Sequence, residues 1–414
     1  MRIFDQFDLR GTLRHLAAAV LIICMVCLNA CSSSAAGKGD TTSASASQAA
    51  SASAQTRDAS ASKAQIFGLV TDKNVSAQSS SYTDTIQVRP AYGRKLMLQK
   101  YSRGSKTWVT TKTYTLDNVR TAKVKLEFRK SSWANSSYSD WRIVLAATKD
   151  DGKYISPTIR LTTRNREKLS ITSKAAVVIN ARTGVVLYAK NMNEKRAQAS
   201  TTKVMTAIVA MENKDLNDRI TITSKAASEP YSYYTWHTGD AIHMKNLLYA
   251  ALMRSSNGAA TALAEGTAGS VSRFAEMMNA KAQKLGAVNT KYVNAHGLDT
   301  SGHYSTAYDT ALITAFAYLN FAKFRSIIGT SSYSFRSIKG GYTYNITTTN
   351  ELLGKIEGFK GGKTGTTSNA GNCFTGVYTK GGKTFIVVTL GSSTHASRWT
   401  DTEALINYAS KYGW

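Results

Sequence analysis

The chain has 414 residues and a formal net charge of +26, and 43% of its residues are hydrophobic. That length is ample for two or three domains with real cores. The positive charge favours anionic partners such as lipid headgroups, acidic wall polymers or nucleic acid, unless it merely solvates the surface.

The first 31 residues predict an export signal. Arginines precede an apolar run at 16–28, which is too short to span a bilayer as a mature helix. The run ends at Ala30-Cys31, followed by three serines, and resembles a bacterial lipoprotein signal in which Cys31 is lipidated. An ordinary secretory signal cut near Ala30 is the alternative. We therefore expect an exported protein, anchored to the cell membrane and facing the cell wall, with no nucleic-acid partner.

Export also determines how the cysteines are interpreted. Cys24 and Cys27 leave with the signal and Cys31 carries lipid, so Cys373 alone remains and no disulfide framework is possible. We expect Cys373 to be a small buried hydrophobe. Residues 32–64 are almost entirely small and polar, which predicts a disordered tether rich in serine and alanine.

Residues 65–168 alternate between apolar and polar side chains, as in Val124, Leu126 and Phe128 and again from Trp141 to Leu145. Several short strands within about 100 residues are typical of an immunoglobulin-like β-sandwich. No catalytic constellation is visible there, so we interpret the segment as a spacer or a binding module.

From residue 169 to 414 the pattern changes. A hairpin at 176–188 precedes helical patterns, and strand patterns return near the end. Helices enclosed between an early hairpin and late strands predict a sheet built from both ends of the domain. The expected helices lie at 201–211, 244–254, 258–267, 272–285 and 399–412, and the late strands at 374–378 and 385–390.

The stretch GFKGGKTGTT at 358–367 has two interpretations. A phosphate-binding loop requires a glycine five residues before Gly362, but that position is Glu357. The stretch therefore favours an active-site strand that presents Lys363, Thr364 and Gly365 to an acidic substrate.

Two other motifs supply possible catalytic groups. Ser200 and Lys203 are three residues apart at the start of a predicted helix, a spacing that brings both onto one face. A lysine kept neutral by burial can take the proton of a serine nucleophile. Ser255-Ser256-Asn257 stands between two predicted helices, where it either caps the next helix or supplies Ser255 as a proton relay and Asn257 as a substrate ligand.

The order of these motifs is more specific than any one of them. Their surroundings resemble the serine-type D-alanyl-D-alanine carboxypeptidases, the low-molecular-mass penicillin-binding proteins, over roughly 170–414. The resemblance implies an α/β penicillin-binding fold of an antiparallel sheet flanked by helices, with a helical subdomain. The matching segments are ASTTKVMTA, LLYALMRSSNGAA, NAHGLDTSGHYSTAYD and GGKTGTTSNAGNC.

The resemblance also implies residue roles. Ser200 resembles the acylated nucleophile, Lys203 its base, Ser255 the proton relay to the leaving D-alanine and Asn257 the ligand of the peptide amide. Backbone N–H groups of Ser200 and Thr366 would form an oxyanion hole.

On the predicted active-site strand, Lys363 would supply positive potential, and Thr364, Gly365 and Thr366 would bind the terminal carboxylate of the substrate. Arg398 is similar in position to a carboxylate-binding arginine, although a salt bridge to Asp401 or Glu403 is an equal alternative.

We therefore expect a cofactor-free enzyme that trims peptidoglycan stem peptides and is inhibited covalently by β-lactams. A β-lactamase is disfavoured because no glutamate lies between Glu276 and Glu351. A zinc peptidase is disfavoured because the spacing of His303 and Asp309 is one residue shorter than in its ligand motif. A penicillin-binding sensor with slow or no turnover stays open.

Overall fold

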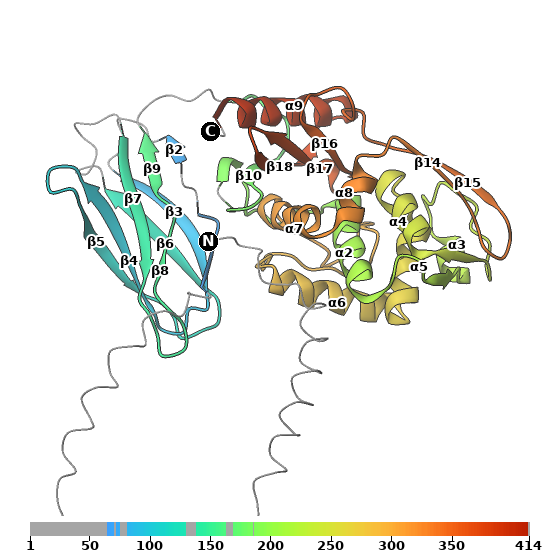
Figure 1. The fold of residues 1–414 in the computed structure, drawn as a ribbon, viewed down its shortest axis with the longest axis horizontal. Helices are drawn as coiled ribbons and strands as arrows, with labels where there is room; N and C mark the ends of the chain where they lie inside the picture. Colours follow the sequence, from blue (N-terminus) through green and yellow to red (C-terminus); the bar gives the residue numbers. More distant parts are fainter. Residues whose placement is uncertain are drawn as a thin grey trace, which may run out of the picture.

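The protein is described here from a computed structural model (Figure 1). The described residues are 64–69, 72–74, 81–129, 138–162, 169–184 and 186–412. The predicted signal, Cys31 and nearly all of the predicted tether lie outside the described residues. The expected domain boundary at 168 falls in one of the gaps between them.

The described residues between 64 and 162 form two sheets that share one hydrophobic core. The predicted alternation is confirmed here, since Val124, Leu126 and Phe128 are buried. The rings of Phe128 and Trp141, from different sheets, pack edge to face at 5.2 Å. One sheet has the order β1-β3-β6 and the other β2-β9-β7-β4-β5, with β8 beside β7. Their bounds are β1 Gln65–Phe67, β2 Asp72–Asn74, β3 Ser81–Arg89, β4 Lys95–Ser102, β5 Thr107–Thr115, β6 Ala122–Arg129, β7 Tyr138–Leu145, β8 Tyr154–Ile155 and β9 Ile159–Thr162.

The sheet of the C-terminal part is antiparallel, in the order β11-β10-β18-β17-β16. The early hairpin lies beside the last strand, and Val177 pairs with Val388. This confirms that both ends of the domain build one sheet. The strands are β10 Ala175–Asn180, β11 Val186–Lys190, β16 Phe359–Thr367, β17 Gly371–Lys380 and β18 Lys383–Ser392.

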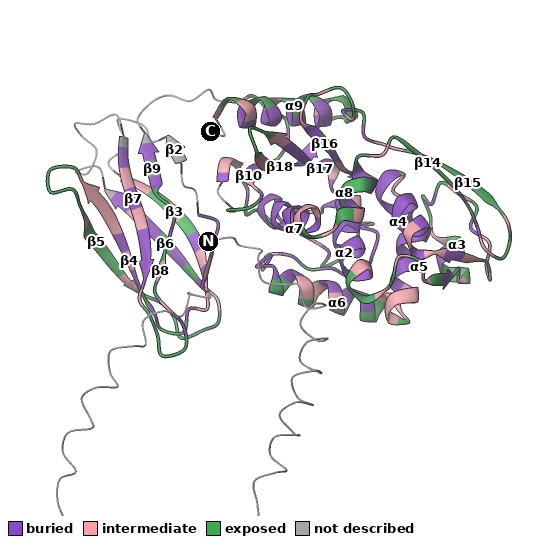
Figure 2. Cartoon of the chain, in the orientation of Figure 1, coloured by how far each residue is buried: buried purple, intermediate pink, exposed green. Residues whose placement is uncertain are grey.

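Helices cover both faces of this sheet. Successive strand residues point to opposite faces, so Val178 belongs to the core beneath α9 (His395–Tyr412) while Val177 belongs to the core on the helical side. On that side α7 (Ala307–Asn320) contacts β10 and β18, and its residues are buried from Ala307 to Ala317 (Figure 2). The inner strands β10, β17 and β18 are therefore largely buried, whereas Lys360 and Thr366 of the edge strand β16 are exposed.

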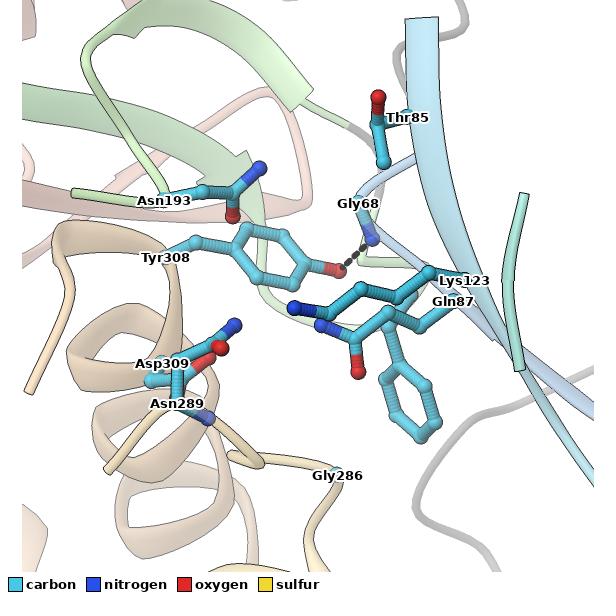
Figure 3. A pocket seen from close by; sticks show the side chains of 10 residues that line it. Gly68, Thr85, Gln87, Lys123, Asn193, Gly286, Asn289, Tyr308 and Asp309 are labelled. Carbon is cyan, nitrogen blue, oxygen red and sulfur yellow. Dashed lines mark hydrogen bonds between the residues drawn. The ribbon is translucent and has the colours of Figure 1, made fainter. Parts of the chain in front are cut away.

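The N-terminal sheets meet the C-terminal part at a small junction. Gly68 N donates to the Tyr308 hydroxyl at 2.8 Å (Figure 3). The Phe67 ring lies against Gly286, where a Cβ would come within 2.1 Å of it. A cavity of about 100 Å³ remains between the two parts, with Gln87 and Lys123 on one side and Asn289 on the other. These contacts join the two parts of the described structure.

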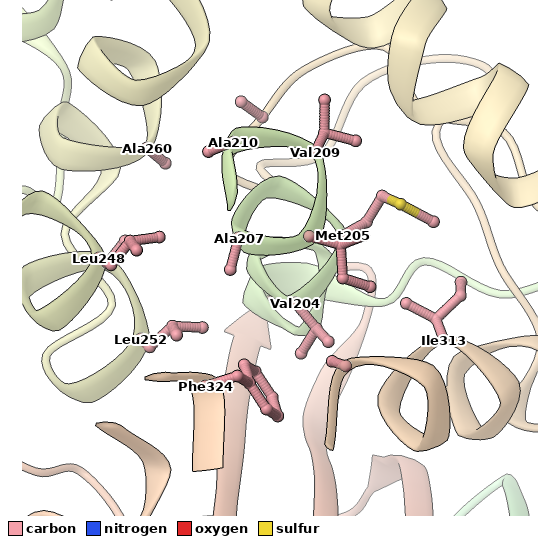
Figure 4. Packing of buried hydrophobic residues seen from close by; sticks show 14 of the residues in the cluster. Val204, Met205, Ala207, Val209, Ala210, Leu248, Leu252, Ala260, Ile313 and Phe324 are labelled. Carbon is pink, nitrogen blue, oxygen red and sulfur yellow. The ribbon is translucent and has the colours of Figure 1, made fainter. Parts of the chain in front are cut away.

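The helical region surrounds α2 (Lys203–Asn213). Its residues from Lys203 to Ala210 are all buried, which confirms the predicted buried helix. Val204 and Ala207 share a cluster with Leu248 and Phe324 (Figure 4). The remaining elements are β12 Arg219–Thr221, α3 Ser224–Ser228, β13 Ala241–His243, α4 Met244–Met253, α5 Asn257–Ala268, α6 Val271–Lys284, α8 Ala322–Ile328, β14 Ser332–Arg336 and β15 Thr343–Thr347.

Among the described helices, none taken singly has the length and apolar character needed to cross a bilayer. The sharply bent pair α7 and α8 passes that test only when the two are joined, and α7 is buried in the core of the protein.

Candidate active site

Ser200 lies in a short 3₁₀ turn, η2 (Ala199–Thr202), that runs directly into α2. Ala199 has φ +49°, a left-handed conformation that is uncommon outside glycine. Gly297 packs against this turn, and a Cβ at that glycine would lie 2.0 Å from the Ala199 carbonyl oxygen. Neighbouring loops therefore fix the position of Ser200.

Lys203 is fully buried next to Ser200. Its Nζ donates to Ser200 Oγ at 2.8 Å, to Asn257 Oδ1 at 2.7 Å and to the His296 carbonyl at 2.8 Å. Burial lowers the Lys203 pKa well below its usual value, and the charge of Lys363 lowers it further, against a smaller opposing effect of Glu229. A buried amine with a lowered pKa can be neutral near physiological pH and act as a base.

In the turn between α4 and α5, one residue caps the next helix and another lies in the predicted site. Ser256 is the N-cap, and its Oγ accepts from Ala259 N and from Trp236 Nε1. Asn257 bridges two segments, because its Oδ1 accepts from Lys203 while its Nδ2 donates to the Pro230 carbonyl at 2.7 Å. The capping alternative thus applies to Ser256, and Asn257 lies in the site as expected.

Ser255 has φ +69° and is only partly buried. Its hydroxyl forms no hydrogen bond with any other residue that the structure describes. The turn places Ser255 two residues from Asn257, but the structure gives it no direct bond to Ser200 or Lys203.

β16 carries Lys363 past the nucleophile. Lys363 is 1% exposed, and its Nζ donates to the Thr364 carbonyl at 2.7 Å. Burial, and then the charge of Arg398, lower the Lys363 pKa to about 7. A Cβ at Gly365 would lie 2.9 Å from Ser200 N. The strand therefore runs against the nucleophile turn at the position where the sequence places the motif.

Arg398 belongs to α9 and contacts the end of β16, where its Nη1 donates to Thr366 Oγ1 at 3.2 Å. The alternative salt bridge is wrong for the described residues. Asp401 instead accepts bonds from Thr172, Ser173 and Ser392 and forms no ion pair with Arg398, and neither does the exposed Glu403. Arg398 is 3% exposed and its Nε has no hydrogen-bond partner in the described structure, so a buried cation stands beside Thr366.

Two residues of the site were missed by sequence reasoning. Glu229 accepts from Thr261 Oγ1 at 2.9 Å, and its other oxygen lies 3.6 Å from His296 Nε2. Burial, and then the charge of Lys203, lower the His296 pKa to about 3, so the imidazole is neutral at physiological pH and the contact is no ion pair. Glu229 belongs to none of the matching segments, and His296, although it lies in NAHGLDTSGHYSTAYD, binds Lys203 through its backbone carbonyl and not through its side chain.

The remaining candidates take structural positions. His303 Nε2 bonds Thr202 Oγ1, and its Nδ1 accepts from Val293 N. In the described parts of the chain no three His, Cys, Asp or Glu residues are grouped to hold a metal, so the zinc alternative lacks a ligand set there. Cys373 is buried as predicted, and burial raises its pKa to about 11.

Comparison with known proteins agrees with this geometry. The family described as D-alanyl-D-alanine carboxypeptidase matches residues 162–394. The chain is 34% identical over 269 residues to the D-alanyl-D-alanine carboxypeptidase DacF of Bacillus subtilis, covering 64% of this chain and 66% of the relative, just under two thirds. It is 32% identical to a D-alanyl-D-alanine carboxypeptidase of Streptomyces sp. K15, covering 58% of this chain and 88% of the relative.

Solved structures give the same result. The Streptomyces K15 DD-transpeptidase superposes with a TM-score of 0.56 at 30% identity, covering 59% of this chain and 100% of that chain. Penicillin-binding protein D2 of Listeria monocytogenes, solved in its cefotaxime-bound form, superposes with a TM-score of 0.53 at 29% identity, covering 59% of this chain and 100% of that one. Because the family match spans more than half of the sequence, the chain belongs to the D-alanyl-D-alanine carboxypeptidase family of serine peptidases.

Proposed function

We propose that this protein is a serine D-alanyl-D-alanine carboxypeptidase that removes the terminal D-alanine of peptidoglycan stem peptides. The observation that carries the proposal is the 2.8 Å bond between Ser200 Oγ and the Nζ of Lys203, a fully buried lysine of lowered pKa. A serine beside a base of this kind is an activated nucleophile.

The reaction begins when Ser200 Oγ attacks the carbonyl carbon of the penultimate D-alanine and passes its proton to Lys203. The backbone N–H groups of Ser200 and Thr366 stabilise the oxyanion of the tetrahedral intermediate. The C–N bond then breaks, and Ser255 relays the proton from Lys203 to the leaving amine of D-alanine. Water next attacks the ester on Ser200 and gives up a proton to Lys203. The bond between the acyl carbon and Ser200 Oγ then breaks, Lys203 returns the proton to Ser200 Oγ, and the shortened peptide leaves.

Substrate binding involves β16. The buried cations Lys363 and Arg398 lie on either side of the Thr364–Thr366 segment, which suits a terminal carboxylate. Thr366 already accepts from Arg398 and donates to Asn372 Oδ1 at 3.3 Å, and its hydroxyl can turn from that long bond to donate to the carboxylate. Asn257 would bind the amide of the peptide that precedes the scissile bond. β-Lactams, whose carbonyl and carboxylate imitate this arrangement, are expected to acylate Ser200.

The N-terminal part supports a placement at the envelope. We propose that its two sheets, which share the core around Trp141, form an immunoglobulin-like sandwich acting as a spacer or wall-binding module. The lipid on Cys31 and the tether would anchor the protein to the cell membrane. The catalytic part would then face the wall.

The experiment is D-alanine release from diacyl-L-Lys-D-Ala-D-Ala by the protein and by its Ser200→Ala variant. Release by the wild type alone supports the proposal. If neither releases D-alanine but fluorescent penicillin still labels the wild type, the protein is a penicillin-binding sensor with slow or no turnover. Absence of both release and label would overturn the assignment of the site.

A further inference from the structure

The loop of residues 229–240, between α3 and β13, carries two exposed tyrosines. It is bonded to the turn Ser255-Ser256-Asn257 between α4 and α5, which we call the catalytic turn. Tyr231 is 69% exposed and Tyr233 is 58% exposed. Both have left-handed backbones, with φ +57° and +62°. A bulky residue in that region is a conformational outlier, and such strain is typical of functional sites.

The strain is concentrated around the candidate active site. Seven described residues other than glycine have positive φ. Four of them are Ala199, Tyr231, Tyr233 and Ser255, which lie in the nucleophile turn, in this loop or in the catalytic turn. Left-handed residues thus occur in this loop and in both segments that carry Ser200 and Ser255.

Bonds to the catalytic turn hold the loop in this conformation. Ser232 Oγ accepts from Gly258 N at 2.8 Å, and Trp236 Nε1 donates to Ser256 Oγ at 3.1 Å. The Pro230 carbonyl accepts from Asn257 Nδ2. The residues that alternate with the two tyrosines are thus fastened inward, which leaves Tyr231 and Tyr233 directed outward on a fixed backbone.

A cation lies beside one of the two tyrosines. The guanidinium of Arg254, which directly precedes Ser255, lies 5.0 Å from the centre of the Tyr233 ring. A guanidinium over an aromatic face keeps its donors available for an anion. We call Tyr231, Tyr233 and Arg254 the aromatic edge of the site.

The direction of the substrate indicates what this edge can bind. If the terminal carboxylate binds at Thr366 and Arg398, and Ser200 attacks the bond before it, the peptide continues past Asn257. Asn257 is bonded to Pro230, the neighbour of Tyr231. The residues that precede D-Ala-D-Ala are thereby led to the aromatic edge.

We propose that the aromatic edge is a subsite for the stem-peptide residues that precede D-Ala-D-Ala, an inference that rests on the proposed function. The tyrosine faces pack on the aliphatic chain of the diamino acid, and Arg254 binds the free carboxylate of the γ-linked acidic residue before it. A single exposed tyrosine needs no explanation. Two of them, on a strained loop whose Pro230 carbonyl is bonded to Asn257, form a built surface.

The test compares two peptides and penicillin. Tyr233→Ala and Tyr231→Ala variants are measured with acetyl-D-Ala-D-Ala, in which an acetyl group replaces the upstream residues, and with L-Ala-γ-D-Glu-L-Lys-D-Ala-D-Ala. Tyrosine is enriched among the contact residues whose truncation costs about fivefold or more in affinity, so kcat/KM for the pentapeptide should fall by that factor. The acetylated peptide should lose less, and the rate of acylation by penicillin should not change.

The matched control is Tyr92→Ala, because Tyr92 is also exposed, at 56%, and also has a positive φ, +37°, but lies in the turn between β3 and β4 of the N-terminal part. It should leave all three rates unchanged. Equal losses of the loop variants with both peptides and with penicillin would show that the loop only positions the catalytic turn, and would overturn the proposal. Unchanged pentapeptide kinetics would overturn it as well.

A binding measurement separates this inference from the proposed function. The Ser200→Ala variant is titrated with the pentapeptide by calorimetry, with and without Tyr233→Ala. Weaker binding in the double variant supports the aromatic edge even if the wild type releases no D-alanine. Equal binding refutes it even if the wild type is a fully active carboxypeptidase.

Discussion

Substitution of Gly365 by alanine tests how closely β16 approaches the nucleophile. The added Cβ would lie 2.9 Å from Ser200 N, 3.0 Å from Ala199 Cβ and 3.1 Å from the Gln198 carbonyl oxygen. Non-bonded carbon atoms prefer about 3.5 Å or more, so the strand and the turn must separate by roughly half an ångström. Gly365 has no positive φ, and alanine can therefore adopt its strand conformation.

The displaced atom is the nitrogen proposed to stabilise the oxyanion. Loss of one oxyanion-hole donor costs about 3 kcal/mol, a factor of roughly 10² to 10³ in kcat. We expect Gly365→Ala to lower the rate of acylation by fluorescent penicillin by about that factor. The melting temperature should fall by only a few degrees, because the crowding is confined to three atoms at one edge of the sheet.

Gly329→Ala is the matched control. Its Cβ would also approach backbone, 3.3 Å from the Lys360 carbonyl oxygen, without a positive φ and away from Ser200. This variant should acylate like the wild type. Wild-type acylation by Gly365→Ala, with an unchanged melting temperature, would refute the proposed closeness of strand and nucleophile.

The remaining predictions concern charge. Glu229 opposes the lowering of the Lys203 pKa, so Glu229→Gln should move the acidic limb of the acylation rate to lower pH, and a shift to higher pH would contradict this. Arg398 lowers the pKa of Lys363, which is about 7, so Arg398→Gln should raise that pKa and move the alkaline limb of kcat/KM upward, besides weakening peptide binding. Burial lowers the His303 pKa to about 4, below its usual 6.5, so the unfolded state binds more protons between these values and acid destabilises the fold. From pH 6.5 to 5 the loss is about 2 kcal/mol, which chemical denaturation should detect in the wild type and find reduced in His303→Gln; equal pH dependence would show that His303 is not buried neutral.

Much of the site could be predicted because its residues follow local rules. The three-residue spacing of Ser200 and Lys203 brings them together on any helical turn, and the 2.8 Å bond confirms it. The Lys363 strand was predicted once the phosphate-loop spacing had failed. Asn257 was found through its motif, although a cap alone would have explained the same residues.

Other features leave no trace in the sequence pattern. The His296 carbonyl binds Lys203 through the backbone, which any residue could supply. Glu229 is one acidic residue in a loop, and it enters the site only because α5 carries Thr261 to it. Arg398 was predicted with two alternatives, since only the folded strand shows that Thr366 and not Asp401 is its partner.

The fold, like the site, could be predicted from the sequence only in part. The hairpin at β10 and β11, the buried α2 and the late strands follow from period and composition. Helix α7 was not predicted, although its residues from Ala307 to Ala317 are buried all round, as those of α2 are. The left-handed backbones of Tyr231 and Tyr233 oppose the intrinsic preference of tyrosine and exist only through bonds to a distant turn.

The measurement that tests the central claim most directly is mass spectrometry of the protein quenched during turnover of a D-Ala-D-Ala peptide, or after reaction with penicillin. Proteolytic mapping should place the acyl group on the peptide that contains Ser200, and Lys203→Ala should form no adduct. An adduct on another residue, or one formed at an unchanged rate without Lys203, would contradict the assignment of Ser200 as nucleophile and Lys203 as its base.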